Sequence, residues 1–107
     1  MPLFKIKKQI FYWIKNGQKT IDIRKGCAYK GDRAVFQCGP FLLKMQIIKK
    51  EEGKLVEILR PDNYKAAVPI ANSVEEAINF LKRLYGETEG VFTAYYLQPI
   101  GDSPKKG

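Results

Sequence analysis

Histidine is absent from this chain of 107 residues, and cysteine occurs only twice, at Cys27 and Cys38. The lack of histidine removes the commonest general base and the Ser–His and Cys–His nucleophile systems. Two cysteines are too few for a structural zinc site, which needs four nitrogen or sulfur ligands. We therefore expect no bound metal and no cofactor, and two buried thiols rather than a disulfide.

Long apolar runs are also missing, since none approaches the roughly 20 residues that span a bilayer. The N-terminus alternates lysines with apolar residues and has no small-residue cleavage site, so it does not read as a signal peptide. We expect a cytoplasmic protein with no membrane partner. Its size fits one domain over residues 1–100, followed by a flexible tail over residues 101–107. Abundant lysine, glutamate and isoleucine favour a thermophilic source.

Acidic residues are scarce in the N-terminal third of the chain. Residues 1–33 contain nine basic and two acidic side chains, whereas residues 34–100 contain eight of each, and the formal net charge is +8. A protein that only needs to be soluble tends to intersperse the two signs. Concentrated positive charge is typical of proteins that bind a polyanion such as RNA. A solvated basic helix without a partner is the alternative.

The periodicity of apolar residues predicts an α+β fold. Helical spacing predicts helices over residues 4–16 and 73–85, the second with a capping box formed by Ser73 and Glu76. Period-two alternation and β-branched or aromatic runs predict strands over residues 18–24, 33–38, 42–50 and 91–97. Residues 55–60 fit a strand or a short helix equally well. Mostly sequential strands predict an antiparallel or mixed sheet, as in a small, partly open β-barrel with helices packed on it.

A glycine turn leads directly into the charged first strand of this sheet. On a strand, Asp22 and Arg24 share one face about 7 Å apart, so they can pair or meet one ligand together. Lys19 has the parity of Ile21 and Ile23, which we expect to be buried. A lysine on the core side is costly, so either the strand begins after Lys19 or its side chain turns into a cleft. A surface ion pair beside an exposed lysine is the alternative interpretation.

Gly17, Lys19, Asp22 and Arg24 resemble the signature of the ASCH domain family, Gly-x-Lys-x-x-Glu-x-Arg, with Asp22 where the family usually has glutamate. The order of the predicted elements extends the resemblance over roughly residues 3–98. It implies a PUA-like fold, a small β-barrel of about five strands with flanking helices. It also implies RNA binding in a cleft beside the motif. The shorter acid reaches one methylene less far than glutamate.

As a binding module, the chain would recognise single-stranded or structured RNA through a basic cleft. Four cations would contact phosphates, which fix position more than sequence: Lys19, Arg24, Lys25 and Lys30. Asp22 would accept a hydrogen bond from a base amine or orient its cationic neighbours. Tyr29, in a loop bounded by glycines, would stack on an unpaired base.

As an enzyme, the chain would be a small amidohydrolase of an acylated nucleoside. Some ASCH-like proteins resemble amidohydrolases of N-acetylated cytidine that use the motif lysine, a threonine at the position of Asp22 and a glutamate ahead of the late helix. In this reading Lys19 would act as a base and Asp22 would position water. Residues 66–72, ahead of the late helix, contain no acid. The incomplete catalytic set therefore favours the binding module.

Overall fold

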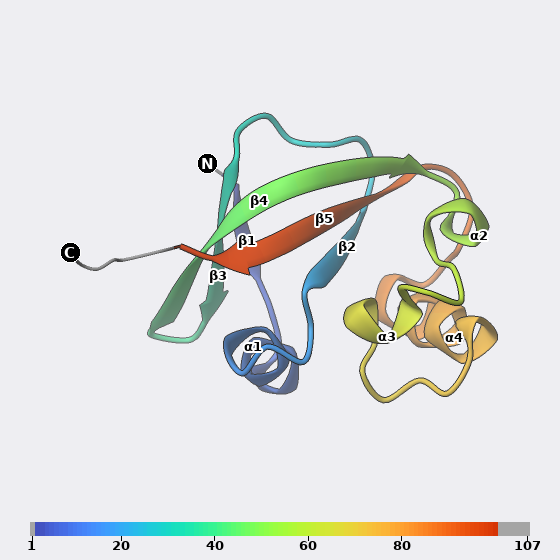
Figure 1. Ribbon diagram of the computed structural model, residues 1–107, viewed down its shortest axis with the longest axis horizontal. Coiled ribbons are helices and arrows are strands. Elements are labelled where there is room, and N and C mark those ends of the chain that lie inside the picture. Colours follow the sequence, from blue (N-terminus) through green and yellow to red (C-terminus); the bar gives the residue numbers. More distant parts are fainter. Residues whose placement is uncertain (1, 101–107) are drawn as a thin grey trace.

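The computed structural model describes residues 2–100, which form a curved five-stranded sheet in the order β1-β3-β4-β5-β2 (Figure 1). Its strands are β1 (Leu3–Lys5), β2 (Ile21–Lys25), β3 (Arg33–Cys38), β4 (Phe41–Gly53) and β5 (Phe92–Pro99). The β1 strand runs parallel to β3, and the other neighbouring pairs are antiparallel. The mixed sheet is therefore confirmed. No pairing is recorded between the two edge strands, β1 and β2, within the described residues, so the barrel stays partly open.

In the described part of the chain, four helices lie on one side of this sheet. They are α1 (Lys8–Lys15), α2 (Leu55–Ile58), α3 (Tyr64–Ala67) and α4 (Val74–Tyr85). In Figure 1, α1 lies below one end of the sheet and the group of α2, α3 and α4 lies below the other. The ambiguous segment at residues 55–60 is thus a short helix. The α3 helix was not predicted, because four residues carry too little periodicity to be recognised.

The prediction of a helix over residues 4–16 is wrong at its beginning. Leu3–Lys5 form β1, and the helix starts only at Lys8. Phe4 is buried while both of its neighbours are exposed, which is the period-two pattern of a strand. Its ring lies 5.6 Å from the rings of both Phe36 and Tyr95, measured between centroids. The strand was not predicted, because the lysines and apolar residues of this segment are spaced in a way that fits an amphipathic helix equally well.

The helix ends follow the sequence signals closely. Asn16 caps α1, and Gly17 has φ +87°, a left-handed conformation that glycine adopts without strain. At the start of α4, Ser73 Oγ accepts a hydrogen bond from the Glu76 N–H at 3.1 Å. In the predicted capping box, the Glu76 carboxylate would accept from the N–H of Ser73 in return. In the structure it accepts from the N–H of the preceding residue, Asn72, at 2.9 Å.

The hydrophobic interior consists of two clusters. The first packs β2 and β5 against α2, α3 and α4, and its large members include Ile21, Ile23, Leu55, Ile58, Leu81 and Phe92. The second packs α1 against β1, β3, β4 and β5, with Phe4, Ile10, Trp13, Ile14, Phe36, Met45 and Tyr95. Phe80 and Leu84 of α4 touch both clusters. Burial of Ile21 and Ile23 is as predicted.

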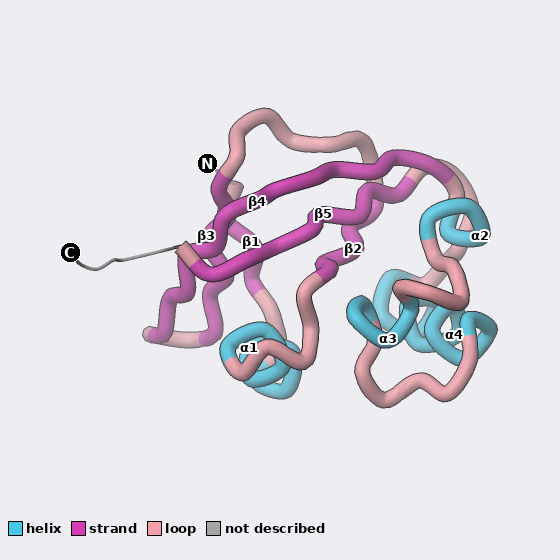
Figure 2. Tube along the Cα trace, viewed as in Figure 1, coloured by secondary structure: helices cyan, strands magenta, loops and turns pink. Residues whose placement is uncertain are grey.

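The remaining segments are loops and turns, of which the connection between β2 and β3 arches over the sheet edge away from the helices in Figure 2. Cys27 lies exposed in this loop and Cys38 is half-buried; both are free thiols. The expected burial of both thiols is therefore wrong for Cys27, which follows a glycine turn into solvent.

None of the described helices is long and apolar enough to cross a membrane. The tail expected at residues 101–107 lies outside the described residues.

Candidate functional site

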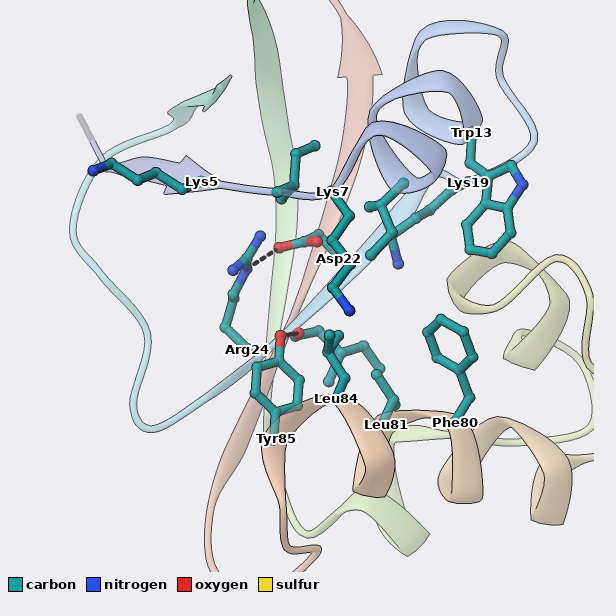
Figure 3. Close-up of a pocket in the computed structure, with 13 residues that line it drawn as sticks. Lys5, Lys7, Trp13, Lys19, Asp22, Arg24, Phe80, Leu81, Leu84 and Tyr85 are labelled. Atoms are coloured by element: carbon teal, nitrogen blue, oxygen red, sulfur yellow. Dashed lines mark hydrogen bonds and ion pairs between the residues drawn. The ribbon is translucent and has the colours of Figure 1, made fainter. Parts of the chain in front are cut away.

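A pocket of about 380 Å³ lies where the two clusters meet, between α1, β2 and α4 (Figure 3). The free edge of β2 forms its floor, the segment that follows β1 forms one wall, and α4 forms the other. Apolar side chains make up most of the lining: Ile6, Ile10, Trp13, Ile23, Phe80, Leu81 and Leu84. The polar side chains are Lys5, Lys7, Lys19, Asp22, Arg24 and Tyr85. The pocket thus holds three of the motif residues, Lys19, Asp22 and Arg24.

Asp22 and Arg24 share one face of β2, as the strand alternation predicts. Arg24 Nε donates to Asp22 Oδ2 at 2.7 Å, and the Asp22 side chain is only 4% exposed. The Arg24 guanidinium also lies 4.3 Å from the centre of the Phe4 ring. These contacts use only one nitrogen and one carboxylate oxygen. Within residues 2–100, no hydrogen-bond partner is recorded for Asp22 Oδ1 or for the two Nη groups of Arg24, which are therefore available to a ligand.

Arg24 keeps its charge despite being partly buried. Burial disfavours the charged guanidinium, but the adjacent Asp22 carboxylate and its hydrogen bond more than compensate and hold the pKa of Arg24 above its ordinary value. The pair therefore holds the Arg24 guanidinium in one position, with its two Nη groups still able to donate, beside the buried Asp22 Oδ1. This is the geometry that binds a phosphate or carboxylate through two hydrogen bonds.

Lys19 is buried, with 5% of its surface exposed. Its ammonium donates to the backbone carbonyl of Ile21 at 2.7 Å and to that of Ala67 at 2.5 Å. An ammonium has three N–H donors, so one remains for a ligand. Both sequence alternatives for this residue hold at once, because β2 begins after Lys19 and its side chain turns into the pocket.

The position of Lys19 changes its acidity. Burial lowers the pKa of Lys19 from 10.5 to about 8; Asp22 opposes this fall, and Arg24 adds to it. The lysine is thus mostly charged at neutral pH but can lose its proton just above it. A cation of this kind can bind an anion, and its neutral form can serve as a base.

Tyr85 completes the side of the pocket formed by α4. Its hydroxyl donates to the backbone carbonyl of Ile23 at 2.5 Å, and burial raises its pKa to about 12. The side chains of Lys19 and Tyr85 therefore donate to two carbonyls, those of Ile21 and Ile23, on the edge of β2 that faces away from β5. A strand edge satisfied by side chains cannot pair with a further strand at these positions. This leaves the pocket to ligands other than an extended peptide.

Three of the predicted site residues lie outside the pocket. Lys25, at the end of β2, forms an ion pair with Glu87. Tyr29 is exposed in the loop between β2 and β3; its N–H donates to Tyr95 Oη at 2.9 Å, and its ring lies 5.8 Å from that of Phe4. Lys30 is exposed in the same loop. The loop thus touches the pocket only indirectly, through Phe4, which lies against Arg24.

Two lysines of the pocket were missed as site residues. Lys5 and Lys7 flank the exit from β1, where a helix was predicted, so neither lysine was assigned to the site. Figure 3 shows Lys7 reaching into the space between Asp22 and α4, whereas Lys5 extends away from it. Nothing in the sequence signals these roles, because they depend on β1 lying near the open edge of the barrel. Within residues 2–100, no three histidine, cysteine, aspartate or glutamate side chains gather as a metal site requires.

Comparisons with known proteins place the fold and nothing finer. No family model matches the sequence, and no curated protein matches it. Among solved structures, the hypothetical protein PH0355 superposes with a TM-score of 0.76 at 18% identity, over 94% of this chain and all of the other. Protein PF0455 from Pyrococcus furiosus superposes with a TM-score of 0.65 at 21% identity, covering 94% of this chain and 98% of the other.

A third structure carries a family name. ASCH from Zymomonas mobilis superposes with a TM-score of 0.65 at 14% identity, over 90% of this chain. The chain has the fold of an ASCH protein. The expected fold class, a partly open five-stranded barrel with flanking helices, is therefore confirmed. The present chain covers 65% of the Zymomonas protein, and at this identity the likeness extends to the fold alone.

Proposed function

We propose that the chain is an ASCH-type domain that binds single-stranded or structured RNA through the pocket between α1, β2 and α4. The fold, the four motif-like residues and the excess of basic residues in the N-terminal third all support this proposal. The observation that carries it is the Asp22–Arg24 pair. One hydrogen bond holds the two side chains together and leaves the remaining donors and acceptor free inside a pocket.

The free groups divide naturally between the two parts of a nucleotide. Lys7, Lys19 and Arg24 supply N–H donors for a phosphate, and Arg24 supplies two in one plane. Asp22 Oδ1 accepts a hydrogen bond from an exocyclic amine of a base. The apolar lining around Trp13 and Phe80 accommodates the flat face of that base.

Outside the pocket, the loop between β2 and β3 provides further contacts. Tyr29 exposes its ring and is proposed to stack on a neighbouring unpaired base. Lys25 and Lys30 are proposed to contact phosphates, with Lys25 exchanging its ion pair with Glu87 for one with RNA. Because these side chains are exposed, each contributes less than a group inside the pocket.

Titration of a single-stranded RNA of about eight nucleotides, a length typical of small single-strand-binding folds, tests the proposal. Lys7→Ala removes an exposed pocket cation whose ammonium forms no hydrogen bond within residues 2–100, and Arg24→Ala removes the guanidinium. Lys82→Ala, an equal charge change on the outer face of α4, is the matched control. We expect clear losses for the two pocket variants and near wild-type affinity for the control. Equal losses in all three would indicate a diffuse basic surface, and no binding at low salt would overturn the proposal.

A second candidate function rests on the lowered pKa of Lys19. A buried lysine with a pKa of about 8 beside a buried carboxylate is suited to general base chemistry, with Asp22 positioning water. The substrate would be a free acylated nucleoside, and the products would be the nucleoside and a carboxylate. Asp22 is the only acid that lines the described pocket, which favours binding over hydrolysis. Incubation with N-acetylcytidine, comparing wild type with Lys19→Met, separates the two functions.

A further inference from the structure

A second groove lies on the opposite side of α1 from the pocket. It has a volume of about 290 Å³ and runs between α1 and the turn that joins β3 to β4. Its lining includes three aromatic residues, Phe11, Tyr12 and Phe41, and two lysines, Lys8 and Lys15. The proposed function uses none of these residues, so their arrangement requires its own explanation.

The aromatic rings of this groove are open to solvent. Tyr12 is 53% exposed and Phe41 is 64% exposed, whereas Phe11 is buried beneath them. The Phe41 ring lies 6.4 Å from that of Phe11 and is tilted by 47°. Phe41 therefore rests on a buried ring that holds it in place while one part of its surface stays free. A supported, exposed ring is a platform on which a flat group can stack.

The charge around the groove selects the occupant. Lys8 and Lys15 are both exposed, and no acidic residue occurs in residues 2–21 or 33–50, the segments that contain the lining of the groove. An anionic ligand with flat faces fits this combination, and a single strand of RNA has both features. Aromatic rings interleaved with lysines bind such strands by base stacking and phosphate contacts.

We propose that this groove is a second subsite for the RNA strand held by the pocket, where an unpaired base stacks on Tyr12 or Phe41 and phosphates contact Lys8 and Lys15. The inference rests on the proposed function. Lys7 reaches into the pocket and Lys8 lines the groove, so consecutive residues at the start of α1 connect the two subsites. A helix with its side chains is about 10 Å across, so only a strand longer than one nucleotide can occupy both.

The dependence on ligand length provides the test. Binding of cytidine monophosphate and of a single-stranded RNA of about eight nucleotides is measured for the wild type and for the double variant Tyr12→Ala/Phe41→Ala. Leu42→Ala is the matched control, because Leu42 is 59% exposed on the same strand and lies outside the groove. The conservative double variant Tyr12→Phe/Phe41→Tyr keeps both rings.

We expect the loss of both rings to weaken binding of the longer RNA by roughly tenfold to a hundredfold, the usual range for one stacked base. Affinity for cytidine monophosphate should not change, and the conservative variant should bind like the wild type. If the double alanine variant binds the longer RNA as tightly as Leu42→Ala does, the inference is overturned and the groove is left to an acidic protein segment.

The same measurements, extended to Lys7→Ala and Arg24→Ala with both ligands, separate this inference from the proposed function. Normal cytidine monophosphate binding with no effect of the rings on the longer RNA overturns the second subsite alone. A ring effect on the longer RNA, combined with no effect of Lys7→Ala or Arg24→Ala on either ligand, overturns the pocket and keeps the groove. Absence of all RNA binding overturns both.

Discussion

The two sides of the pocket differ in the way they carry charge. The side built by β1, α1, β3 and the first part of β4 falls within residues 2–50, which contain twelve basic and two acidic side chains. The side built by α2, α3 and α4 falls within residues 51–90, which contain five basic and eight acidic ones. Both sides bury an ordinary hydrophobic cluster. The difference therefore concerns what each surface attracts rather than how each side folds.

The polar contacts on the two sides also have different purposes. In the acidic half, which comprises residues 51–90, Arg60 bonds the Glu51 carboxylate through both Nη groups. The Tyr96 hydroxyl, from the neighbouring strand β5, donates to Glu51 at 2.8 Å. Asn63 donates to the same hydroxyl at 3.2 Å, which attaches the segment between α2 and α3 to the sheet. This network is internally satisfied. In the pocket and along α1, by contrast, several lysines and the Arg24 fork keep unused donors.

Lys19 connects the two halves, and its titration is expected to have the largest effect. Its pKa is about 8 in the folded chain and about 10.5 when unfolded. Between these pH values the unfolded chain binds the extra proton, so stability should rise with pH across this window. The full rise is on the order of 3 kcal/mol. Urea unfolding of the wild type and Lys19→Met from pH 7 to pH 10 should show this rise only in the wild type.

RNA affinity should change in the opposite direction over the same window. Loss of the proton removes a cation from the pocket, so wild-type affinity should fall above about pH 8.

The control for the stability prediction is the comparison of the wild type with Lys19→Met. Tyr85 and the other titrating groups are present in both proteins, so their contributions to the pH dependence of stability cancel. Parallel stability curves for the wild type and Lys19→Met would show that Lys19 does not titrate in this range.

Arg24→Ala is expected to have the next largest effect. It leaves the Asp22 carboxylate buried without its partner, which is costly in a protein interior. Because the Arg24 side chain is 19% exposed, solvent screens part of this cost, and we expect destabilisation of about 2 kcal/mol. The double variant Asp22→Ala/Arg24→Ala should be less destabilised than the sum of the single variants, by roughly 1 kcal/mol. Additive losses in urea unfolding would mean that the pair is not coupled.

Much of the basic half could be predicted from the sequence, but its arrangement could not. Strand alternation placed Asp22 and Arg24 on one face, and the parity of Lys19 indicated that either the strand begins after it or its side chain turns into a cleft. These are local relations that a single strand determines. The position of Lys7 depends on β1 pairing with β3, about thirty residues further along the chain. Such non-local pairing leaves no trace in the local pattern, so the pocket wall formed by the segment that follows β1 could not be predicted.

The acidic half shows a similar limit on what the sequence predicts. The α4 helix was predicted almost to the residue, because a cap, a long apolar stripe and a terminal glycine all agree. The α2 and α3 helices are single turns, and their burial against the sheet rather than their propensity holds them helical. Tertiary packing decides such short elements, and the sequence alone leaves them open.

A matched pair of lysines tests the charge comparison directly. Lys15 and Lys82 are both exposed in the last turn of a helix, the first in α1 and the second in α4. Each alanine substitution removes one charge from an equivalent position. We expect Lys15→Ala to reduce the slope of log affinity against log salt by about 0.7, the contribution of one phosphate on a single strand. Lys82→Ala should leave the slope unchanged, and equal slopes for the two variants would contradict a charge-segregated binding surface.

The smallest expected effect concerns the stability of the acidic half alone. Ser73→Ala removes the side chain that accepts from the Glu76 N–H at the start of α4, and loss of such a cap costs about 1 kcal/mol. The Glu76 carboxylate still caps the N–H of Asn72, so the helix should shorten little. Because α4 presents only apolar side chains and Tyr85 to the pocket, RNA affinity should stay at the wild-type value while the urea midpoint falls. Ser73→Asp, which restores an acceptor at the cap, should recover the midpoint. A loss of affinity as large as that of Lys7→Ala would instead mean that the two halves respond as one unit, with the start of α4 controlling the shape of the pocket.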